Sequence, residues 1–237
     1  MIFFRIGLFL ISLLLASTAQ AQKLIQISGV KDSSDSSAAL EVVKAAYGRL
    51  GYEVEIHWFD GEEALEKSSS GEMDAELQRI DGLSEKYPDL VQIEIPINFL
   101  QGAVFTTGST FEILSWHSLK SFRIGIVKGI LFAEQGTEGM NVTRAESYQE
   151  LFNYLKNGTV DVAVMPRING LHALKKLDIK GIVEVDGTLE TLFLYHYVHE
   201  RHKDLVPKLE KIFKSMLVSG ATREMRTSAY EKLLNAE

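Results

Sequence analysis

Short apolar runs alternate with longer amphipathic stretches along most of this chain. Residues 24–28 (LIQIS) are apolar enough for a strand, and the apolar positions of residues 40–50 then recur at helical spacing until Gly51. Residues 52–58 (YEVEIHW) alternate apolar and polar side chains, as a half-buried strand does. Strand, helix and strand in this order predict a βαβ unit, whose crossover is right-handed in nearly all proteins.

Polar residues just before several amphipathic stretches predict where helices begin. Asp35 is expected to cap the first helix. Asp60 with Glu63, and Ser147 with Glu150, have the spacing of a capping box, in which each side chain binds a free backbone N–H of the first turn. The sequence therefore predicts helix starts at these three places.

One phrase occurs twice in the chain. A helix-like run is followed by Gly71-x-x-Asp74 in the first copy and by Gly158-x-x-Asp161 in the second, and each copy continues into a short apolar run. The glycine ends the helix in the left-handed conformation, the aspartate turns the chain, and the apolar run enters a parallel sheet. Two such units predict two similar α/β lobes, although two units of one sheet would give the same pattern.

The two longest apolar stretches, residues 98–106 and 189–197, are expected to cross between the lobes. The first lobe would then comprise residues 22–102 and 191–237 with the C-terminal helices, and the second lobe residues 103–190. A lobe inserted between two crossings closes on its partner by hinge motion around a ligand. Shorter apolar runs predict the remaining strands, and amphipathic runs predict two final helices: strands at residues 73–77, 91–95, 123–127, 142–145, 160–164 and 182–185, and helices at residues 203–217 and 221–234.

Residues 1–21 have the composition of a secretory signal peptide. They carry one charge, an apolar run at residues 6–16, and a small-x-small ending at Ala19 and Ala21, after which cleavage is expected. A membrane anchor is the alternative, but about 11 apolar residues are too few for a bilayer, which needs roughly 20. We expect an exported periplasmic protein with no stable membrane insertion, and the absence of cysteine leaves it without disulfides or a thiol for a lipid anchor.

The net charge of −7 argues against nucleic acid as a partner. The sequence contains no cysteine nucleophile, no phosphate-binding loop and no G-x-S-x-G motif, so it predicts no catalytic residue, no enzyme activity and no cofactor. Residues 196–202 (HYVHERH) have three histidines, but a strand would place His196 and His199 on opposite faces. We therefore predict no metal site.

Four segments together resemble one protein family, and they span essentially the whole chain after the predicted signal peptide: residues 71–79, 116–129 (WHSLKSFRIGIVKG), 148–164 and 201–220. The chain resembles family 3 bacterial extracellular solute-binding proteins, the periplasmic receptors for polar amino acids. The resemblance implies a two-lobed α/β fold of type II, with two hinge strands and a small ligand between the lobes. It also implies a monomer that passes its ligand to an inner-membrane ABC permease.

Within this resemblance, Arg79 matches the arginine of the first lobe that holds the ligand carboxylate. Gly129 matches the helix start of the second lobe, where the resemblance implies that backbone N–H groups also hold the ligand carboxylate. Ile130 stands at a position where the family commonly has a threonine. The acidic residue that receives an α-amine falls on Pro166, with Arg167 beside it. An α-amine would find no carboxylate there. The expected ligand is therefore a small polar, carboxylate-bearing solute, an amino acid or a related anion, but not an ordinary amino acid held by both its charges.

The residues themselves support part of this site. Arg79 and Arg167 each follow an apolar run, and a guanidinium at a strand end can clamp a carboxylate with two hydrogen bonds. The alternative for Arg79 is a structural ion pair with Asp81 or Glu76. Lys31 and Asp32 follow the first strand and Trp58 ends the second, so all three are predicted ligand contacts. The alternative is a polar loop for Lys31 and Asp32, and a core or rim aromatic for Trp58.

Two other functions remain open at this point. Periplasmic cyclohexadienyl dehydratases share the fold, so the protein would then be an enzyme acting within the cleft. A sensory partner that docks on a membrane signalling protein is the second alternative.

Overall fold

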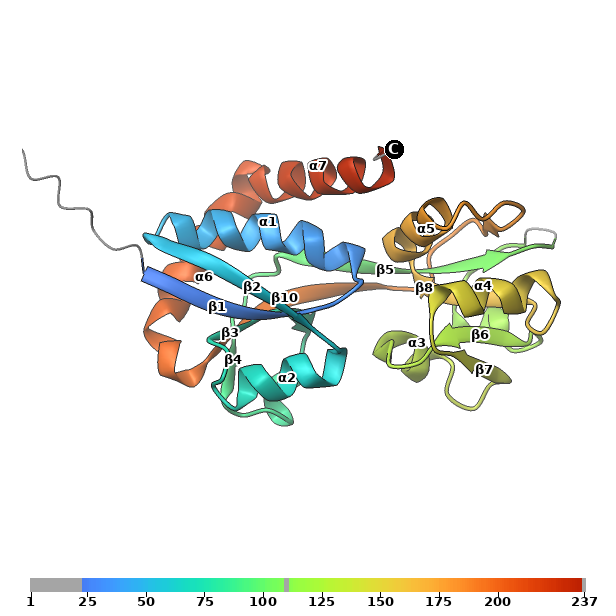
Figure 1. Ribbon diagram of the computed structural model, residues 1–237, viewed down its shortest axis with the longest axis horizontal. Helices are drawn as coiled ribbons and strands as arrows, with labels where there is room; N and C mark the ends of the chain where they lie inside the picture. Colours follow the sequence, from blue (N-terminus) through green and yellow to red (C-terminus); the bar gives the residue numbers. More distant parts are fainter. Residues whose placement is uncertain (1–22, 109–110, 236–237) are drawn as a thin grey trace, which may run out of the picture.

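The structure is a computed structural model that describes residues 23–108 and 111–235, and within these it forms two α/β lobes (Figure 1). The strands form one sheet with the order β2-β1-β3-β10-β5-β8-β6-β7, to which β4 and β9 add at β10 and β5. The predicted two-lobed α/β fold class is confirmed. The predicted signal peptide at residues 1–21 lies outside the described residues.

Lobe 1 is named here for the part of the molecule that begins with β1. Its parallel strand β1 lies between β2 and β3, with Ile25 opposite Val54 and Ile27 opposite Ala75. Helix α1 makes the predicted crossover from β1 to β2. The elements of lobe 1 are β1 (Lys23–Val30), α1 (Ser34–Gly48), β2 (Tyr52–Phe59), α2 (Gly61–Ser69), β3 (Ala75–Ile80), η1 (Leu83–Glu85), β4 (Leu90–Gln92), η3 (Glu200–Leu205), α6 (Val206–Ser219) and α7 (Ala221–Asn235).

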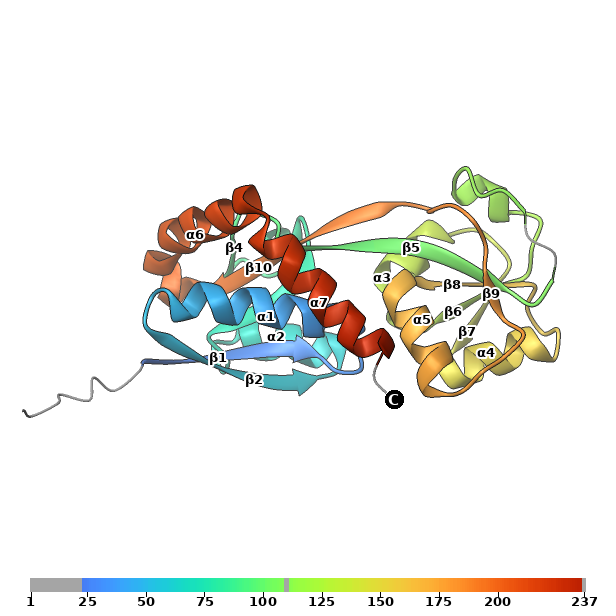
Figure 2. The same cartoon turned by 90° about the horizontal axis from the view of Figure 1, so that it is seen from above.

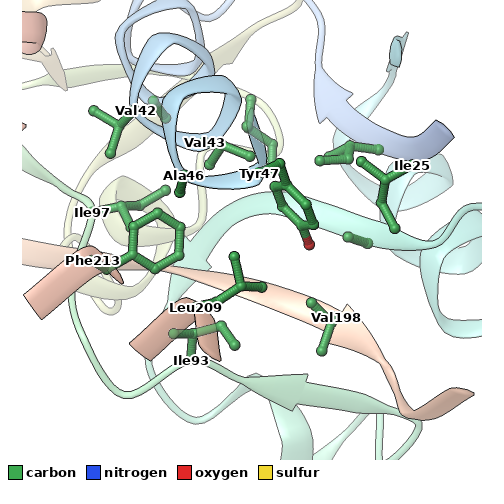
Figure 3. Packing of buried hydrophobic residues seen from close by; sticks show 14 of the residues in the cluster. Ile25, Val42, Val43, Ala46, Tyr47, Ile93, Ile97, Val198, Leu209 and Phe213 are labelled. Atoms are coloured by element: carbon green, nitrogen blue, oxygen red, sulfur yellow. The ribbon is translucent and has the colours of Figure 1, made fainter. Parts of the chain in front are cut away.

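The core of lobe 1 lies between its sheet and the helices α1 and α6. Val43 and Tyr47 of α1 meet Ile25 of β1 and Phe213 of α6, all fully buried or nearly so (Figure 3). Each such apolar side chain contributes about 1.5–3 kcal/mol when it leaves water. The opposite face of the sheet is covered by α2, which contributes Leu65 to a smaller cluster.

Lobe 2 is named for the part of the molecule that contains β6. Its strand β6 runs parallel to β7 on one side and β8 on the other. Strand β8 (VAVMP) is buried on both faces, as its continuous apolar sequence predicts, because α4 and α5 cover one face and α3 the other. The elements of lobe 2 are η2 (Trp116–Leu119), β6 (Ile124–Val127), α3 (Leu131–Gly136), β7 (Val142–Ala145), α4 (Tyr148–Lys156), β8 (Val162–Pro166), α5 (Arg167–Lys176) and β9 (Val183–Glu184).

Two long strands, β5 (Asn98–Thr106) and β10 (Thr191–His199), connect the lobes. Residues 98–101 of β5 pair antiparallel with residues 191–194 of β10, and residues 102–105 pair with β8 of lobe 2. Strand β5 therefore changes its pairing partner between Gln101 and Gly102.

Two predicted helix caps are wrong. Ser33, and not Asp35, caps α1, because its hydroxyl accepts a hydrogen bond from the N–H of Ser36. Asp60 precedes α2 as predicted but makes no side-chain cap, since its carboxylate is bound to Lys31 instead. The Ser147 cap of α4 is present, with the N–H of Glu150 as its donor.

Helix α5 was not predicted at all. Its sequence has few apolar positions and contains Asn169-Gly170, a pair that favours turns. In the structure Gly170 packs against Phe105, and a Cβ at residue 170 would lie only 2.6 Å from that ring. The glycine is needed for close helix-to-strand packing and does not mark a turn.

Within the described residues, no helix combines the length and apolar character needed to cross a bilayer.

Candidate ligand-binding site

The two lobes meet where the N-terminus of α1 faces α5. The backbone N–H groups of Ser34 and Asp35 both donate to Oδ1 of Asn169, at 3.0 and 3.3 Å. The Ser34 hydroxyl also lies 2.8 Å from Nδ1 of His172, one turn further along α5. Ser34, Asp35 and Asn169 are each less than 9% exposed, so this contact is shielded from water.

The local sequence explains why α1 begins at this junction. Strand β1 ends at Val30, and Asp32 then adopts the left-handed conformation (φ 55°), which aspartate tolerates better than most residues. Ser33 caps the helix, and the N–H groups of the first turn then point toward lobe 2. A 15-residue helix carries partial positive charge at this end, so it favours an oxygen acceptor there.

Asp35 lies buried inside the same junction. Its Oδ1 accepts a hydrogen bond from the Tyr230 hydroxyl of α7 at 3.0 Å, and its Oδ2 has no hydrogen-bond partner. Burial raises the pKa of Asp35 to about 6, although the Tyr230 hydrogen bond and the charge of Arg226 oppose this. Asn98, the first residue of β5, donates to the Asp35 carbonyl oxygen at 3.1 Å. The junction therefore joins α1, α5, α7 and β5.

Arg79 lies within β3, and its side chain is engaged inside lobe 1. Its Nε donates to the fully buried Glu76 carboxylate at 2.8 Å, and its Nη2 donates to the carbonyl oxygen of Gly61 at 2.8 Å. Ser28 and Ser68 also contact the Glu76 carboxylate, which no solvent reaches. Burial raises the pKa of Glu76, and the charge of Arg79 opposes that rise. Of the two partners proposed from the sequence, Arg79 pairs with Glu76.

Arg167 is the first residue of α5, and its guanidinium is also engaged. All three of its nitrogen atoms donate within lobe 2 and to β5: Nε to Glu184 at 2.6 Å, Nη1 to Gln101 at 2.8 Å, and Nη2 to the carbonyl oxygen of Gly187 at 2.6 Å and to the Thr188 hydroxyl. The preceding residue, Pro166, is buried at the end of β8. Arg167 thus ties the start of α5 to the segments around β9 and β5.

The other predicted contacts of lobe 1 lie near the junction but apart from its hydrogen bonds. Lys31 pairs with Asp60 at 2.9 Å, and both side chains are largely exposed. Asp32 is exposed in the turn before α1. Trp58 is 42% exposed and packs its ring against Gly29, where a Cβ would lie 2.7 Å from the indole. Trp58 therefore covers the end of β1 and remains partly exposed to solvent.

Gly129 and Ile130 precede α3 in lobe 2. Gly129 has a left-handed φ of 82°, and its N–H lies 3.4 Å from the Glu134 carboxylate. That carboxylate also binds Arg144, and this hydrogen bond lowers the pKa of Glu134. Ile130 is the residue before the helix and is partly buried. A side chain of the protein thus already accepts the hydrogen bond that the resemblance assigns to a ligand.

The three histidines of residues 196–202 serve separate structural contacts. His196 is fully buried, with Nε2 3.0 Å from the Tyr47 hydroxyl and Nδ1 3.1 Å from the Leu77 carbonyl oxygen. His199 caps η3, and Nε2 of His202 lies 2.7 Å from Asp74. Within the described residues no group of three potential ligands could hold a metal ion.

A surface hollow of about 430 Å³ lies in lobe 2, away from the junction. Its lining includes Thr106, Leu155 and the stacked rings of Phe111 and Phe122, whose centroids are 4.6 Å apart. Asp161, the one ionisable residue of this lining, is already bound to Arg123. The hollow contains none of the predicted ligand contacts.

The structure thus brings together a set of residues that differs from the predicted one. The predicted residues Lys31 and Asp32 directly precede α1, and Trp58 packs against Gly29 at the end of β1, whereas Arg79 and Arg167 bind other groups of the protein. Asn169, His172 and Tyr230 were not predicted, and each lies more than 130 positions from its α1 partner. No local pattern in the sequence indicates contacts of this kind.

Comparison with models of protein families finds no match. An uncharacterized protein of Shewanella oneidensis is 25% identical over 191 residues, which are 78% of this chain and 72% of that protein. Solved structures are similar over nearly the whole chain. A histidine kinase sensor domain with similarity to periplasmic binding proteins has a TM-score of 0.71 at 16% identity, covering 87% of this chain and 96% of its own.

Two further structures have ligands in their names. The GluR0 ligand-binding core, a complex with L-glutamate, has a TM-score of 0.73 at 11% identity, with 90% of this chain and 99% of that chain covered. The substrate-binding protein AbpA of an amino acid ABC transporter from Streptococcus pneumoniae, bound to L-arginine, has a TM-score of 0.69 at 16% identity, with 89% and 96% covered. The chain therefore has the fold that amino-acid-binding transport proteins and sensor domains share.

Proposed function

We propose that the protein is a periplasmic solute-binding protein that takes a small polar, carboxylate-bearing ligand between its lobes and delivers it to an inner-membrane ABC permease. The two-lobed fold with two connecting strands supports this, because such lobes close by hinge motion around a ligand. In this proposal the protein binds its ligand without converting it.

The observation that carries the proposal is the pair of backbone donors at the start of α1. The N–H groups of Ser34 and Asp35 converge on one oxygen atom supplied by lobe 2. A carboxylate oxygen of a ligand would satisfy the same donors, with more favourable charge at a helix N-terminus. Recognition would then depend on these donors and on nearby Trp58 and Lys31, since Arg79 and Arg167 are engaged elsewhere.

The ligand class follows from the surroundings and from the related structures. L-Glutamate and L-arginine are the ligands of two proteins with this fold. In this chain Pro166 stands at the end of β8, where the resemblance assigns an acidic residue for the α-amine. We therefore favour a carboxylate whose recognition does not depend on an α-amine, such as a dicarboxylate or a derivative of an amino acid.

A thermal-shift screen tests the proposal directly. Amino acids, dicarboxylates and other small organic anions are added to protein that was unfolded and refolded to remove bound compounds. A ligand at one hundred times its Kd should raise the melting temperature by about 5–10 °C. Uncharged polyols at the same concentration are the control. No shift across the whole panel would contradict the proposal.

Two measurements separate the alternatives. Consumption of prephenate by the purified protein would favour an enzyme of the dehydratase kind. Neighbouring genes distinguish transport from signalling, because permease and ATPase genes favour uptake while a membrane kinase or cyclase gene favours a sensory partner. The second alternative has support in the likeness to a histidine kinase sensor domain, which is a likeness of fold.

A further inference from the structure

At the junction of the lobes, polar groups of lobe 1 and lobe 2 bind each other directly. Asn169 of lobe 2 accepts from the first turn of α1 in lobe 1, and His172 contacts the Ser34 hydroxyl beside it. Asn169 is only 8% exposed, so opening the lobes would leave its amide and two backbone N–H groups without these partners until water replaced them. This contact satisfies the helix terminus from within the protein.

The C-terminal helix α7 adds a second connection across the same junction. It runs along α1, and its end lies next to α5 of lobe 2 (Figure 2). The Tyr230 hydroxyl lies 3.0 Å from Asp35 Oδ1 and 3.2 Å from Asn98 Oδ1 on the connecting strand β5. At the end of the helix, Nζ of Lys175 in α5 donates to the Leu234 carbonyl oxygen at 2.6 Å. Helix α7 therefore holds lobe 1, β5 and lobe 2 at once.

The same helix also holds the connecting strand through an aromatic contact. The guanidinium of Arg226 lies over the ring of Phe99, 3.8 Å from its centroid. Cation–π contacts of this kind favour one arrangement of the two groups. If the lobes rotated about the connecting strands, both this contact and the hydrogen bond between Tyr230 and Asn98 would have to change.

We propose that the protein latches its own lobes closed, with Asn169 acting as an internal ligand of α1 and with α7 bracing both lobes. In this view closure does not require a bound solute, and a solute gains access only when Asn169 leaves the α1 N-terminus. This last consequence, competition between Asn169 and a solute, rests on the proposed function, whereas the latch itself does not.

Distances between the lobes test the latch without any ligand. The chain has no cysteine, so a pair introduced at the exposed positions Glu53 in lobe 1 and Lys156 in lobe 2 can carry two fluorophores. Single-molecule energy transfer is measured on refolded full-length protein. The parent should show mainly one short-distance population. Asn169→Ala should raise the open-to-closed ratio about tenfold, and Tyr230→Phe about threefold, in line with the hydrogen bonds that each loses.

Asn153→Ala is the matched control, because Asn153 is an exposed asparagine of lobe 2 outside the junction. Its distances should equal those of the parent. A parent distribution that is already broad and equal to that of Asn169→Ala would overturn the latch. If circular dichroism shows that Asn169→Ala is unfolded, Tyr230→Phe decides alone, and unchanged distances in it overturn the brace and the latch. A ligand screen without a hit would contradict the proposed function but leave these distances as they are.

Discussion

The two Gly-x-x-Asp turns of this protein have the same geometry, but they lead into strands of different character. Gly71 and Gly158 both adopt the left-handed conformation, with φ of 77° and 73°. Each aspartate then binds a neighbouring parallel segment through its N–H and its carboxylate, at 2.7 Å for both bonds of Asp74 and at 2.8 Å for both bonds of Asp161. The partners are Gln26 for the first turn and Arg123 for the second.

The strands that follow the turns differ in what they bury. Strand β3 carries Glu76 into the interior of lobe 1, where it meets Arg79, whereas β8 is apolar along its whole length. Arg167 comes only after β8 ends and remains partly exposed. The turn sequence thus determines how the chain enters a sheet, but not whether the strand will carry charge inside. Two more buried groups that can carry charge, Asp35 of α1 and His196 of β10, also pack within the described part of lobe 1.

The largest effect is expected from removing the two arginines. Arg79→Ala should lower the free energy of unfolding by about 3–5 kcal/mol, because it leaves the buried Glu76 carboxylate without its partner. Arg167→Ala should cost only about 1–2 kcal/mol, since its partners can reach water. Chemical denaturation monitored by circular dichroism measures both values.

The double variant Arg79→Ala with Glu76→Gln is the control for this difference. A neutral side chain at residue 76 removes the unpaired charge, so the double variant should recover much of the lost stability. Equal costs for the two arginines, or no recovery in the double variant, would show that the buried pair is not what distinguishes the lobes. Because Arg79→Ala is expected to be so destabilising, a loss of ligand binding in this variant is informative only if the variant is shown to be folded.

Much of the fold could be predicted from the sequence because it follows from local patterns. The alternation in residues 52–58, the two Gly-x-x-Asp turns and the Ser147 cap each depend on neighbours a few positions apart. The family resemblance added the two-lobed arrangement. The partner of Arg79 could not be chosen, since Glu76 and Asp81 were equally available and only the packing of β3 against Ser28 and Ser68 favours Glu76.

The candidate site could be predicted less well, for a physical reason. Lys31, Asp32 and Trp58 were found because they follow or end strands near the start of α1, but their ligand contacts remain predictions. The contacts of Asn169 and Tyr230 with α1 depend on how two lobes and a C-terminal helix come together. Helical or strand periodicity carries no information on such distant pairs.

The second expected effect concerns pH. Burial lowers the pKa of His196 from 6.5 to about 4 and raises that of Asp35 from 3.8 to about 6. Stability from neutral His196 is present above pH 6.5 and is lost as the pH falls toward 4, whereas the Asp35 contribution is lost as the pH rises from 4 to 6. Each pKa shift changes the free energy of unfolding by about 3 kcal/mol over this pH range. The two changes have opposite signs, so they largely cancel in the parent protein.

In the Asp35→Asn variant, the free energy of unfolding should follow the pH dependence that His196 alone contributes. The stability of this variant relative to the parent should rise by about 3 kcal/mol between pH 4 and pH 7, as measured by urea unfolding across that range. Asp161→Asn in lobe 2 is the matched control of opposite sign, because the hydrogen bond from Arg123 lowers the pKa of Asp161. Its free energy of unfolding relative to the parent should fall as the pH rises toward 3.8, where the unfolded carboxyl ionises, and should stay nearly constant between pH 4 and pH 7. A flat difference for Asp35→Asn would mean that Asp35 titrates normally.

The smallest expected effect comes from the turn glycines themselves. Alanine at either position must adopt a left-handed conformation, which costs about 1–2 kcal/mol. A Cβ at Gly158 would meet nothing within 4 Å, whereas one at Gly71 would lie 3.1 Å from both the Arg201 guanidinium and the His199 ring. Arg201 binds the Gly71 carbonyl oxygen and Asp74, so its displacement would also weaken the first turn. Gly71→Ala should therefore be the more destabilising of the two in urea unfolding, and equal losses would show that the two turns differ only in the strands that follow them.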